Sequence, residues 1–399
     1  MHSGHRHYSI SPTGSCAVFY LQDSSFGIIA FDSKGIYQRK TESISANYYP
    51  ISLTFSQDGR YFATTTRKVD KNTKKGHKKA KQADGVELYV QIYDVNTAMA
   101  VGNQQRIGVN RPEIDATPVV RGTDASVIFV RFIETSGRNV DQLIKKLDIY
   151  SSGIQEADPV HTHYDKSLKF KNTKDYGGTL RISRDGITAV VTLPWLVTVY
   201  RVEDLTLMQS LPVQELNQHL HGIVVPRCFR AETVVISEHQ VHLVLQATTT
   251  FFGVLSWDWY TPISSRSAQF ARVVGMEYNS KPYTVMPVHP VGACLAVYHP
   301  GVKANDTSEL VLVDIASGMV SKVNLSEIVR WVGDKNKADI QFLVVGQDHK
   351  YVFLGDTRGR IGLWQLQPVQ LVFTTKGAGQ VDNNPNQSRL RQYLDILAL

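Results

Sequence analysis

The chain has 399 residues, of which 42% are hydrophobic and 20% charged, with a formal net charge of +7. This composition excludes wholesale disorder, and no apolar run approaches the roughly 18 residues of a transmembrane helix. Cys16, Cys228 and Cys294 are too few and too scattered for a disulfide framework, and the N-terminus has no signal-peptide pattern. The sequence therefore predicts an intracellular protein, cytoplasmic or nuclear.

A short turn, rich in serine, glycine and aspartate, recurs along the chain between two apolar runs. Because Gly and Asp tolerate the backbone angles of a tight reversal, each turn is predicted to join two antiparallel strands. The turns are SPTG at 11–14, SQDG at 56–59, RGTD at 121–124, SRDG at 183–186, SEHQ at 237–240, HPVG at 289–292 and GQDH at 346–349.

Two further extended runs follow each of these hairpins. The third run of a unit is β-branched or aromatic and often ends at Asp, as in FGIIAFD, LYVQIYDV and ELVLVDIAS. The fourth run is more polar, as in IYQRKTES and LMQSLPV. This order predicts sheets whose first strand is buried and whose fourth strand is exposed.

The repeated units predict an all-β fold, a seven-bladed β-propeller of four-stranded antiparallel sheets over residues 1–375. A single four-stranded sheet cannot bury both of its faces, so the units are expected to stabilise one another around an axis. A pair of β-sandwiches would also contain many short strands and is the alternative fold. Units of like strand order and like turn composition favour the propeller.

The turns and strand ends resemble those of the WD40-like propeller superfamily, in the branch with SPDG-type turns. The resemblance covers about residues 7–375 and depends on SQDG followed by RYFATTT, SRDG followed by ITAVVT, and the strand ends IYDV, VYRV, VDIA and LWQL. It implies a propeller fold. The Trp-Asp pair appears only at Trp257-Asp258, so the hydrogen-bond network of tight WD40 repeats is mostly missing.

The positive charge is concentrated in one predicted insertion, residues 67–86. Its first part, RKVDKNTKKGHKKAK, has eight lysines or arginines and one aspartate, which equals the net charge of the whole chain. A second basic stretch, KSLKFKNTK, lies in another predicted insertion, residues 153–177. We interpret both as solvated loops; they are either unrelated polar loops or one positive patch, which Arg106 and Arg111 would extend.

If the two loops share one face, the patch would attract phosphate backbones, anionic lipids or acidic peptides, and a nuclear import signal is a further reading of the first loop. The candidate anion- or partner-binding residues are Lys71, Lys74, Lys75, Lys78, Lys79, Lys81, Lys166, Lys169, Lys171 and Lys174.

The C-terminal segment, residues 376–399, is predicted to be a Gly/Asn/Pro linker (376–386) followed by a short amphipathic helix. Its apolar residues lie at i, i+3, i+4 and i+7, which is one helical stripe. A helix this short is marginal alone, so it is expected to dock either on its own propeller or in a partner's groove. The stripe is Leu390, Tyr393, Leu394 and Leu397.

Residues with metal-binding or catalytic chemistry are sparse. The histidine pairs His161/His163 and His219/His221 have no accompanying Cys, Asp or Glu set with ligand spacing, so no metal site is predicted. No phosphate-binding glycine loop and no nucleophile elbow is present. The sequence predicts no cofactor and no small-molecule substrate.

Three aspartates raise an enzymatic alternative. Asp94, Asp314 and Asp356 would have to converge near the central channel, as carboxylates do in some propeller hydrolases that use calcium. Their positions at the ends of apolar runs favour turn residues instead. A propeller hydrolase with a central-channel site is therefore the least favoured function.

These observations predict a non-catalytic WD40-like propeller that acts as a protein–protein interaction scaffold with other protein subunits in an assembly. The alternative is an RNA- or ribonucleoprotein-associated propeller that binds through its basic loops. Because a fold does not determine a function, the two hypotheses have to be separated by binding surfaces.

Overall fold

The described part of the chain is built almost entirely of β-strands joined by short turns. Its only helical element is η4 (Val213–Glu215), a single 3-10 turn. The computed structural model describes residues 8–11, 16–20, 24–32, 35–44, 48–68, 87–109, 115–121, 124–136, 139–151, 153–163, 179–183, 185–215, 229–236, 240–247, 252–261, 263, 268–272, 284–287, 294–299, 309–314, 320–324, 340–345, 351–356, 361–366, 369–376 and 380–381.

The described strands form seven antiparallel sheets, which we number as blades 1–7 in chain order. Blade 1 is β1 (Tyr8–Ile10), β2 (Cys16–Tyr20), β3 (Phe26–Asp32) and β4 (Gly35–Lys40). Blade 2 is β5 (Tyr48–Phe55), β6 (Tyr61–Lys68), β7 (Glu87–Asp94) and β8 (Ala100–Val109). Blade 3 is β9 (Asp115–Arg121), β10 (Asp124–Ser136), β11 (Asn139–Asp148), β12 (Ile154–Glu156) and β13 (Val160–His163). Blade 4 is β14 (Thr179–Ile182), β15 (Thr188–Leu193), β16 (Leu196–Arg201) and β17 (Leu207–Pro212).

The remaining three blades repeat this order. Blade 5 is β18 (Phe229–Ile236), β19 (Gln240–Ala247), β20 (Phe252–Asp258) and β21 (Ala268–Arg272). Blade 6 is β22 (Thr284–Pro287), β23 (Cys294–His299), β24 (Glu309–Asp314) and β25 (Val320–Asn324). Blade 7 is β26 (Ile340–Val345), β27 (Tyr351–Asp356), β28 (Ile361–Leu366), β29 (Val369–Lys376) and β30 (Gln380–Val381).

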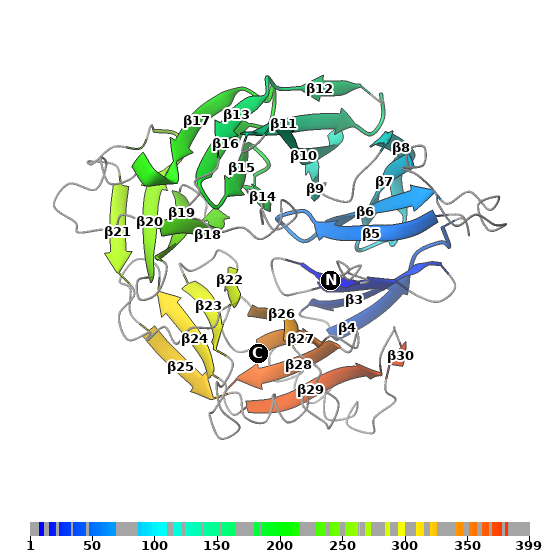
Figure 1. Cartoon of the computed structure of the whole chain (residues 1–399). Coiled ribbons are helices and arrows are strands. Elements are labelled where there is room, and N and C mark those ends of the chain that lie inside the picture. Colours follow the sequence, from blue (N-terminus) through cyan, green and yellow to red (C-terminus); the bar gives the residue numbers. More distant parts are fainter. Residues whose placement is uncertain are drawn as a thin grey trace, which may run out of the picture.

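The blades follow one another around a ring, with the first strand of each nearest the centre (Figure 1). Consecutive first strands are in contact, from β1 with β5 through to β22 with β26. The predicted all-β propeller fold is therefore confirmed by strand order and arrangement. Among the described strands, no sheet combines strands from the two ends of the chain, so no exchanged strand closes the ring there.

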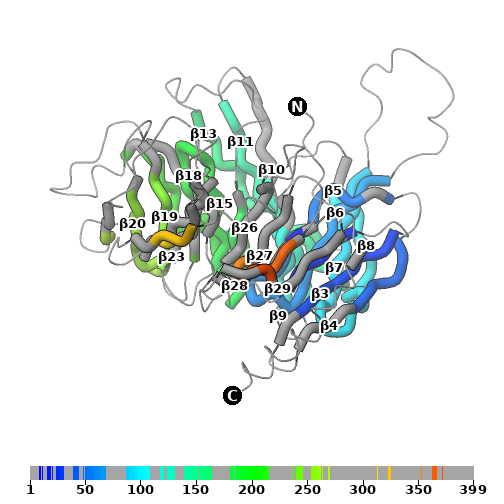
Figure 2. Tube along the Cα trace, turned by 90° about the horizontal axis from the view of Figure 1, so that it is seen from below, coloured from blue at the N-terminus to red at the C-terminus, as the bar shows by residue number. Residues whose placement is uncertain are grey.

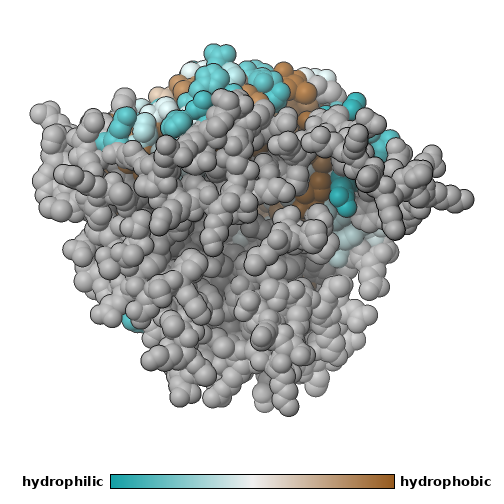
Figure 3. All heavy atoms as spheres, viewed as in Figure 1, coloured by the Kyte–Doolittle hydropathy of each residue, from teal (hydrophilic) through white to brown (hydrophobic). Residues whose placement is uncertain are grey.

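Burial decreases from the inner strands to the outer strand, as the sequence predicted. Every residue of β15 is buried, whereas the fourth strand β17 is mostly exposed. The upper rim of the ring in Figure 3 is accordingly dominated by hydrophilic residues where the chain is described. An inner strand is covered by neighbouring blades on both faces, which favours its continuous apolar sequence.

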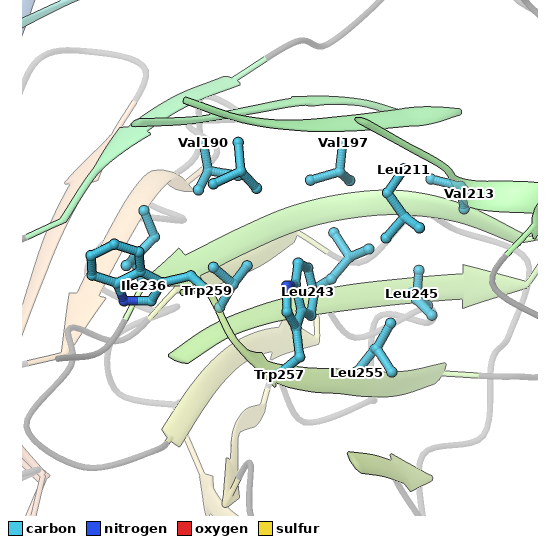
Figure 4. Close-up of a cluster of buried hydrophobic side chains, with 12 residues drawn as sticks. Val190, Val197, Leu211, Val213, Ile236, Leu243, Leu245, Leu255, Trp257 and Trp259 are labelled. Carbon is cyan, nitrogen blue, oxygen red and sulfur yellow. The ribbon is translucent and has the colours of Figure 1, made fainter. Parts of the chain in front are cut away.

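Apolar side chains of adjacent blades interlock and form the core. Figure 4 shows the cluster between blades 4 and 5, where Val190 and Val197 face Leu243 and Trp257. Similar clusters join blade 1 to blade 2, blade 2 to blade 3, and blade 3 to blade 4. Since these described clusters each draw on two blades, neighbouring sheets stabilise one another as expected for a propeller.

The repeated SxDG turn has the same hydrogen bonds in blades 2 and 4. In blade 4 the Ser183 hydroxyl donates to Asp185 Oδ1 at 2.6 Å and accepts from the Thr188 amide at 2.8 Å. The Gly186 amide donates to the Ser183 carbonyl at 2.9 Å, and Gly186 has a φ of 70°. This left-handed conformation favours glycine, which explains the last letter of the motif.

Substitution Ser183→Ala is expected to lower the free energy of unfolding by about 1–3 kcal/mol, because the buried Thr188 amide loses its acceptor. Ser210→Ala, at an exposed position of β17, is expected to change it by less than about 0.5 kcal/mol. Urea denaturation of both variants measures the difference. Equal stabilities would show that the turn hydroxyl is unimportant.

The structure contains strands in parts of both segments that the sequence predicts to be insertions. β6 continues through Lys68, which pairs with Tyr48, so the connection predicted at 67–86 starts at residue 69. In the segment predicted as an insertion at 153–177, β12 and β13 both pair with β11 and form the edge of blade 3. All three residues of β12 and every second residue of β13 are exposed, so their largely polar sequence resembles that of a loop.

The C-terminal prediction is corrected at one point. Gln380 and Val381 pair with Lys376 and Thr375, so part of the predicted linker 376–386 extends blade 7 as β30. The predicted helix with Leu390, Tyr393, Leu394 and Leu397 lies outside the described residues.

Candidate interaction surface

The two basic connections start and end on one face of the ring. A sheet of four antiparallel strands begins and ends at the same edge, where the connection between its second and third strands also lies. Residues 69–86 link β6 to β7, and residues 164–178 leave β13 where His163 pairs with Asn139, at the start of β11. The edge-on view shows the strands crossing the thickness of the ring between its two faces (Figure 2).

The ten predicted lysines themselves lie outside the described residues, as does Arg111. They are Lys71, Lys74, Lys75, Lys78, Lys79, Lys81, Lys166, Lys169, Lys171 and Lys174. The positive patch therefore remains a prediction, supported only by the shared face of its flanking strands.

Arg106, the described residue predicted to extend that patch, is paired with a carboxylate. Its Nη2 lies 3.2 Å from Glu87 Oε1, and Lys68 Nζ lies 3.7 Å from Glu87 Oε2. The Tyr89 hydroxyl donates to Glu87 at 2.9 Å; this bond, with smaller contributions from the two cations, lowers the pKa of Glu87. Part of the positive charge at the base of the loop is thus neutralised within the blade.

The opposite face exposes large hydrophobic side chains in a row. All lie in the turn between the third and fourth strands or at the start of the fourth strand, on blades 2, 3, 4 and 5. Their exposed fractions range from 37% to 68%. We call these residues the turn row: Met99, Tyr150, Ile154, Leu207, Met208 and Tyr260.

Aspartates at the strand ends shape these turns. Asp148 Oδ1 accepts the amides of Tyr150 at 2.8 Å and Ser151 at 2.9 Å, and Asp258 Oδ1 accepts the Tyr260 amide at 2.9 Å. The bond from the Ser151 amide is the main reason why the pKa of Asp148 is lowered. Such side-chain caps fix the backbone so that the next large residue projects outward.

Tyr260 is held in place by the residue before it. Its ring stacks on that of Trp259, with centroids 3.6 Å apart and an interplanar angle of 24°. Trp259 is itself 1% exposed and belongs to the cluster between blades 4 and 5. Tyr260 is therefore an exposed aromatic ring on a rigid support, so binding it would cost little side-chain entropy.

Hydrogen bonds between blades connect neighbouring turns. Gln105 Nε2 donates to the Ile149 carbonyl at 3.0 Å, and Lys146 Nζ donates to the Glu203 carbonyl at 2.9 Å. Gln209 Nε2 donates to the Thr261 carbonyl at 2.7 Å. Each turn thus lies beside the blade before it, so the turns that carry the turn row follow one another along the ring from blade 2 to blade 5.

The histidine pairs do not assemble a metal site in the described part of the chain. His161 Nδ1 lies 2.7 Å from Asp141 Oδ1, and His163 Nδ1 lies 2.8 Å from Asn139 Oδ1, both at the exposed edge of blade 3. Within the described residues, no group of three or more His, Cys, Asp or Glu could hold a metal ion. His219 and His221 lie outside those residues.

The three aspartates of the hydrolase alternative do not meet at the central channel. Asp94 and Asp314 end third strands, β7 and β24, two strands away from the channel, and Asp356 ends the second strand β27. Asp94 Oδ1 accepts the Thr97 amide at 2.8 Å, which makes Asp94 a turn residue. Burial raises the pKa of the Cys16 thiol, which disfavours the thiolate form that a nucleophile needs.

Sequence reasoning missed the turn row, although a signal for it is present. In each case a large apolar residue follows the aspartate after the third run, as in DVNTAM, DIYSSGI, EDLTLM and DWY. The aspartates indicate turns, but the local sequence does not show which side chains these turns expose to solvent.

The comparisons with known proteins give structural similarity only. No family model matches the chain, and no curated protein matches it significantly. Within the described residues, no helix is long and apolar enough to cross a bilayer.

Similar solved structures are remote in sequence. They include the beta-propeller domain of Cps50 (Swd1) from Myceliophteria thermophila, with 12% identity, a TM-score of 0.47, and coverage of 92% of this chain and 97% of that one. A chain of the mitotic checkpoint complex has 12% identity and a TM-score of 0.44 over 90% of this chain and 86% of that one. Hsv2 from Kluyveromyces lactis has 10% identity and a TM-score of 0.44 over 80% and 75%. At such values the assignment to the propeller fold rests on this chain's own strand order and packing.

Proposed function

We propose that this chain is a non-catalytic propeller that binds other protein subunits and holds them in an assembly. The observation that supports this function is the turn row. Large hydrophobic side chains exposed singly are normal on any protein surface. In the described part of the chain, however, the exposed large hydrophobic side chains all lie in the turn between the third and fourth strands or at the start of the fourth strand. These positions belong to four consecutive blades. Exposed apolar side chains at matching places on neighbouring blades, several of them on turns with fixed backbones, suit the role of anchors in a protein interface.

The composition of the turn row suits recognition between proteins. Interfaces obtain most of their binding energy from a few buried aromatic or similar anchors, with tyrosine among the commonest. Tyr150 and Tyr260 supply two such rings on turns fixed by aspartate caps. Met99 and Met208 supply flexible side chains that adapt to a partner's shape.

The test is quantitative affinity purification with the intact chain and with a double variant, Tyr150→Ser with Tyr260→Ser. Both residues are exposed, so folding should be preserved, and thermal unfolding checks this. The variant is expected to lose about tenfold or more of each copurifying subunit, because truncating an interface anchor costs about 2 kcal/mol. Undiminished recovery would contradict the proposal.

A chain lacking residues 69–86 is the matched control, since the ends of β6 and β7 that flank this connection lie at the other face. We expect the chain that lacks these residues to retain its protein partners, both with and without nuclease treatment. Loss of all partners on this deletion or with nuclease would instead favour the RNA-associated alternative, whose binding should fall steeply as salt rises.

A further inference from the structure

The turns that present the turn row are also acidic. In the described turns of blades 2–5, residues 94–100, 148–154, 201–208 and 258–261, arginine and lysine are represented only by Arg201. Against it stand five carboxylates: Asp94, Asp148, Glu203, Asp204 and Asp258. The ammonium group of Lys146 adds one cation beside Glu203, which leaves carboxylates in excess.

The turn geometry favours the charged form of two of these carboxylates, Asp204 and Asp148. Bonds from the Thr206 hydroxyl and amide, together with Arg201, lower the pKa of Asp204 to about 2. The Ser151 and Tyr150 amides lower the pKa of Asp148 in the same way. The turns between first and second strands lie at the same edge and are balanced in blades 2 and 4, where Arg60 and Asp185 are both exposed, so the excess of carboxylates comes from the turns between third and fourth strands.

We propose that the turn row binds a partner segment whose apolar side chains are flanked by lysine or arginine. This inference rests on the proposed function, in which the turn row is a protein-binding surface. The apolar side chains would cover Tyr150, Leu207 and Tyr260, and the cations would lie beside the aspartates between them. Complementary charge of this kind selects the partner and speeds its association, while the apolar contacts supply most of the affinity.

Two segments of the chain itself could also be considered as occupants of the turn row, and their charge and apolar content argue against both. The Lys-rich connection has the cations but almost no large apolar residues. The segment after residue 381 has an apolar stripe with only Arg389 and Arg391 as cations, and it leaves the ring at the outer edge of blade 7, outside the four blades of the turn row. A separate basic segment therefore fits the surface better.

Three synthetic peptides of about 14 residues test this inference against the full chain by fluorescence anisotropy at about 0.15 M salt. The first has leucines at i, i+3, i+4 and i+7 and lysines elsewhere; the second replaces lysine with glutamate; the third replaces leucine with serine. The first peptide is expected to bind about tenfold or more tightly than either of the others. Glu203→Lys should weaken its binding about fivefold or more, and the double variant Tyr150→Ser with Tyr260→Ser should abolish saturable binding.

Equal binding of the first two peptides, or binding that ignores Glu203→Lys and the tyrosine double variant, would overturn the inference. The inference would also be overturned if the first peptide bound a chain ending at residue 381 but did not bind the full chain. The C-terminal segment of the chain would then be the occupant of the turn row. The proposed function can still stand in such a case: copurifying subunits that depend on Tyr150 and Tyr260 would show an interface without charge selection.

Discussion

Substitution Gly102→Ala is expected to lower the free energy of unfolding by about 2–4 kcal/mol, a large effect for a single added methyl group. Gly102 has a φ of 66°, a conformation that strains any residue with a Cβ atom. An added Cβ would also lie only 2.4 Å from Ile149 Cγ2 of the next blade. Ile149 is 1% exposed and fixed in the cluster between blades 2 and 3, so it cannot move aside.

Gly153→Ala is the matched control for this prediction. Its added Cβ would meet only the Ser151 hydroxyl, at 3.1 Å, on an exposed turn where that side chain can rotate away. We expect a change of less than about 1 kcal/mol. Guanidinium denaturation of both variants gives the comparison, and equal losses of stability would contradict the close packing of blade 2 on blade 3.

The second large effect is a loss of stability in acid caused by one buried histidine. Burial lowers the pKa of His242 from 6.5 to about 4, and its Nδ1 lies 2.7 Å from the Ser256 hydroxyl. The unfolded chain therefore binds a proton at this site before the folded chain does. The contribution of His242 to the free energy of unfolding is fully present above pH 6.5. About 3 kcal/mol of it is lost as the pH falls from there to about 4.

His242→Gln should remove this part of the acid sensitivity, because glutamine does not titrate. Urea denaturation of the wild type and the variant at several pH values between neutral and 4 measures the difference in slope. Ser210→Gln, which changes an exposed side chain of β17 and adds no titratable group, is the control and should keep the wild-type slope. A His242→Gln variant with an unchanged slope would show that this imidazole is not desolvated.

The sheet architecture could be predicted because its information is local. The SxDG turns, such as Ser183 to Gly186, each satisfy their hydrogen bonds within six residues. The runs around these turns either alternate between apolar and polar residues, as strands with one buried face do, or are buried throughout, as in β15. The edge strands β12 and β13 could not be predicted because they are short and largely exposed, so their sequence resembles a loop.

Contacts between blades could not be predicted, since they join residues far apart in the chain. The buried Gln142 of blade 3 donates to Thr198 Oγ1 at 2.6 Å and Tyr200 Oη at 2.9 Å in blade 4. Nothing in the sequence around Gln142 indicates these partners. The turns that carry Tyr150 and Tyr260 are indicated locally by their aspartates, but only the order of the strands and blades places these turns on one face.

Hydrogen–deuterium exchange on the chain bound to a copurified subunit tests the central claim most directly. The account predicts slower amide exchange in residues 94–100, 148–154, 201–208 and 258–261 of the complex than in the free chain, with little change at the flanks of the basic connections near residues 68 and 163. Slower exchange confined to those flanks, with the four turns unchanged, would place the partner on the other face and contradict it.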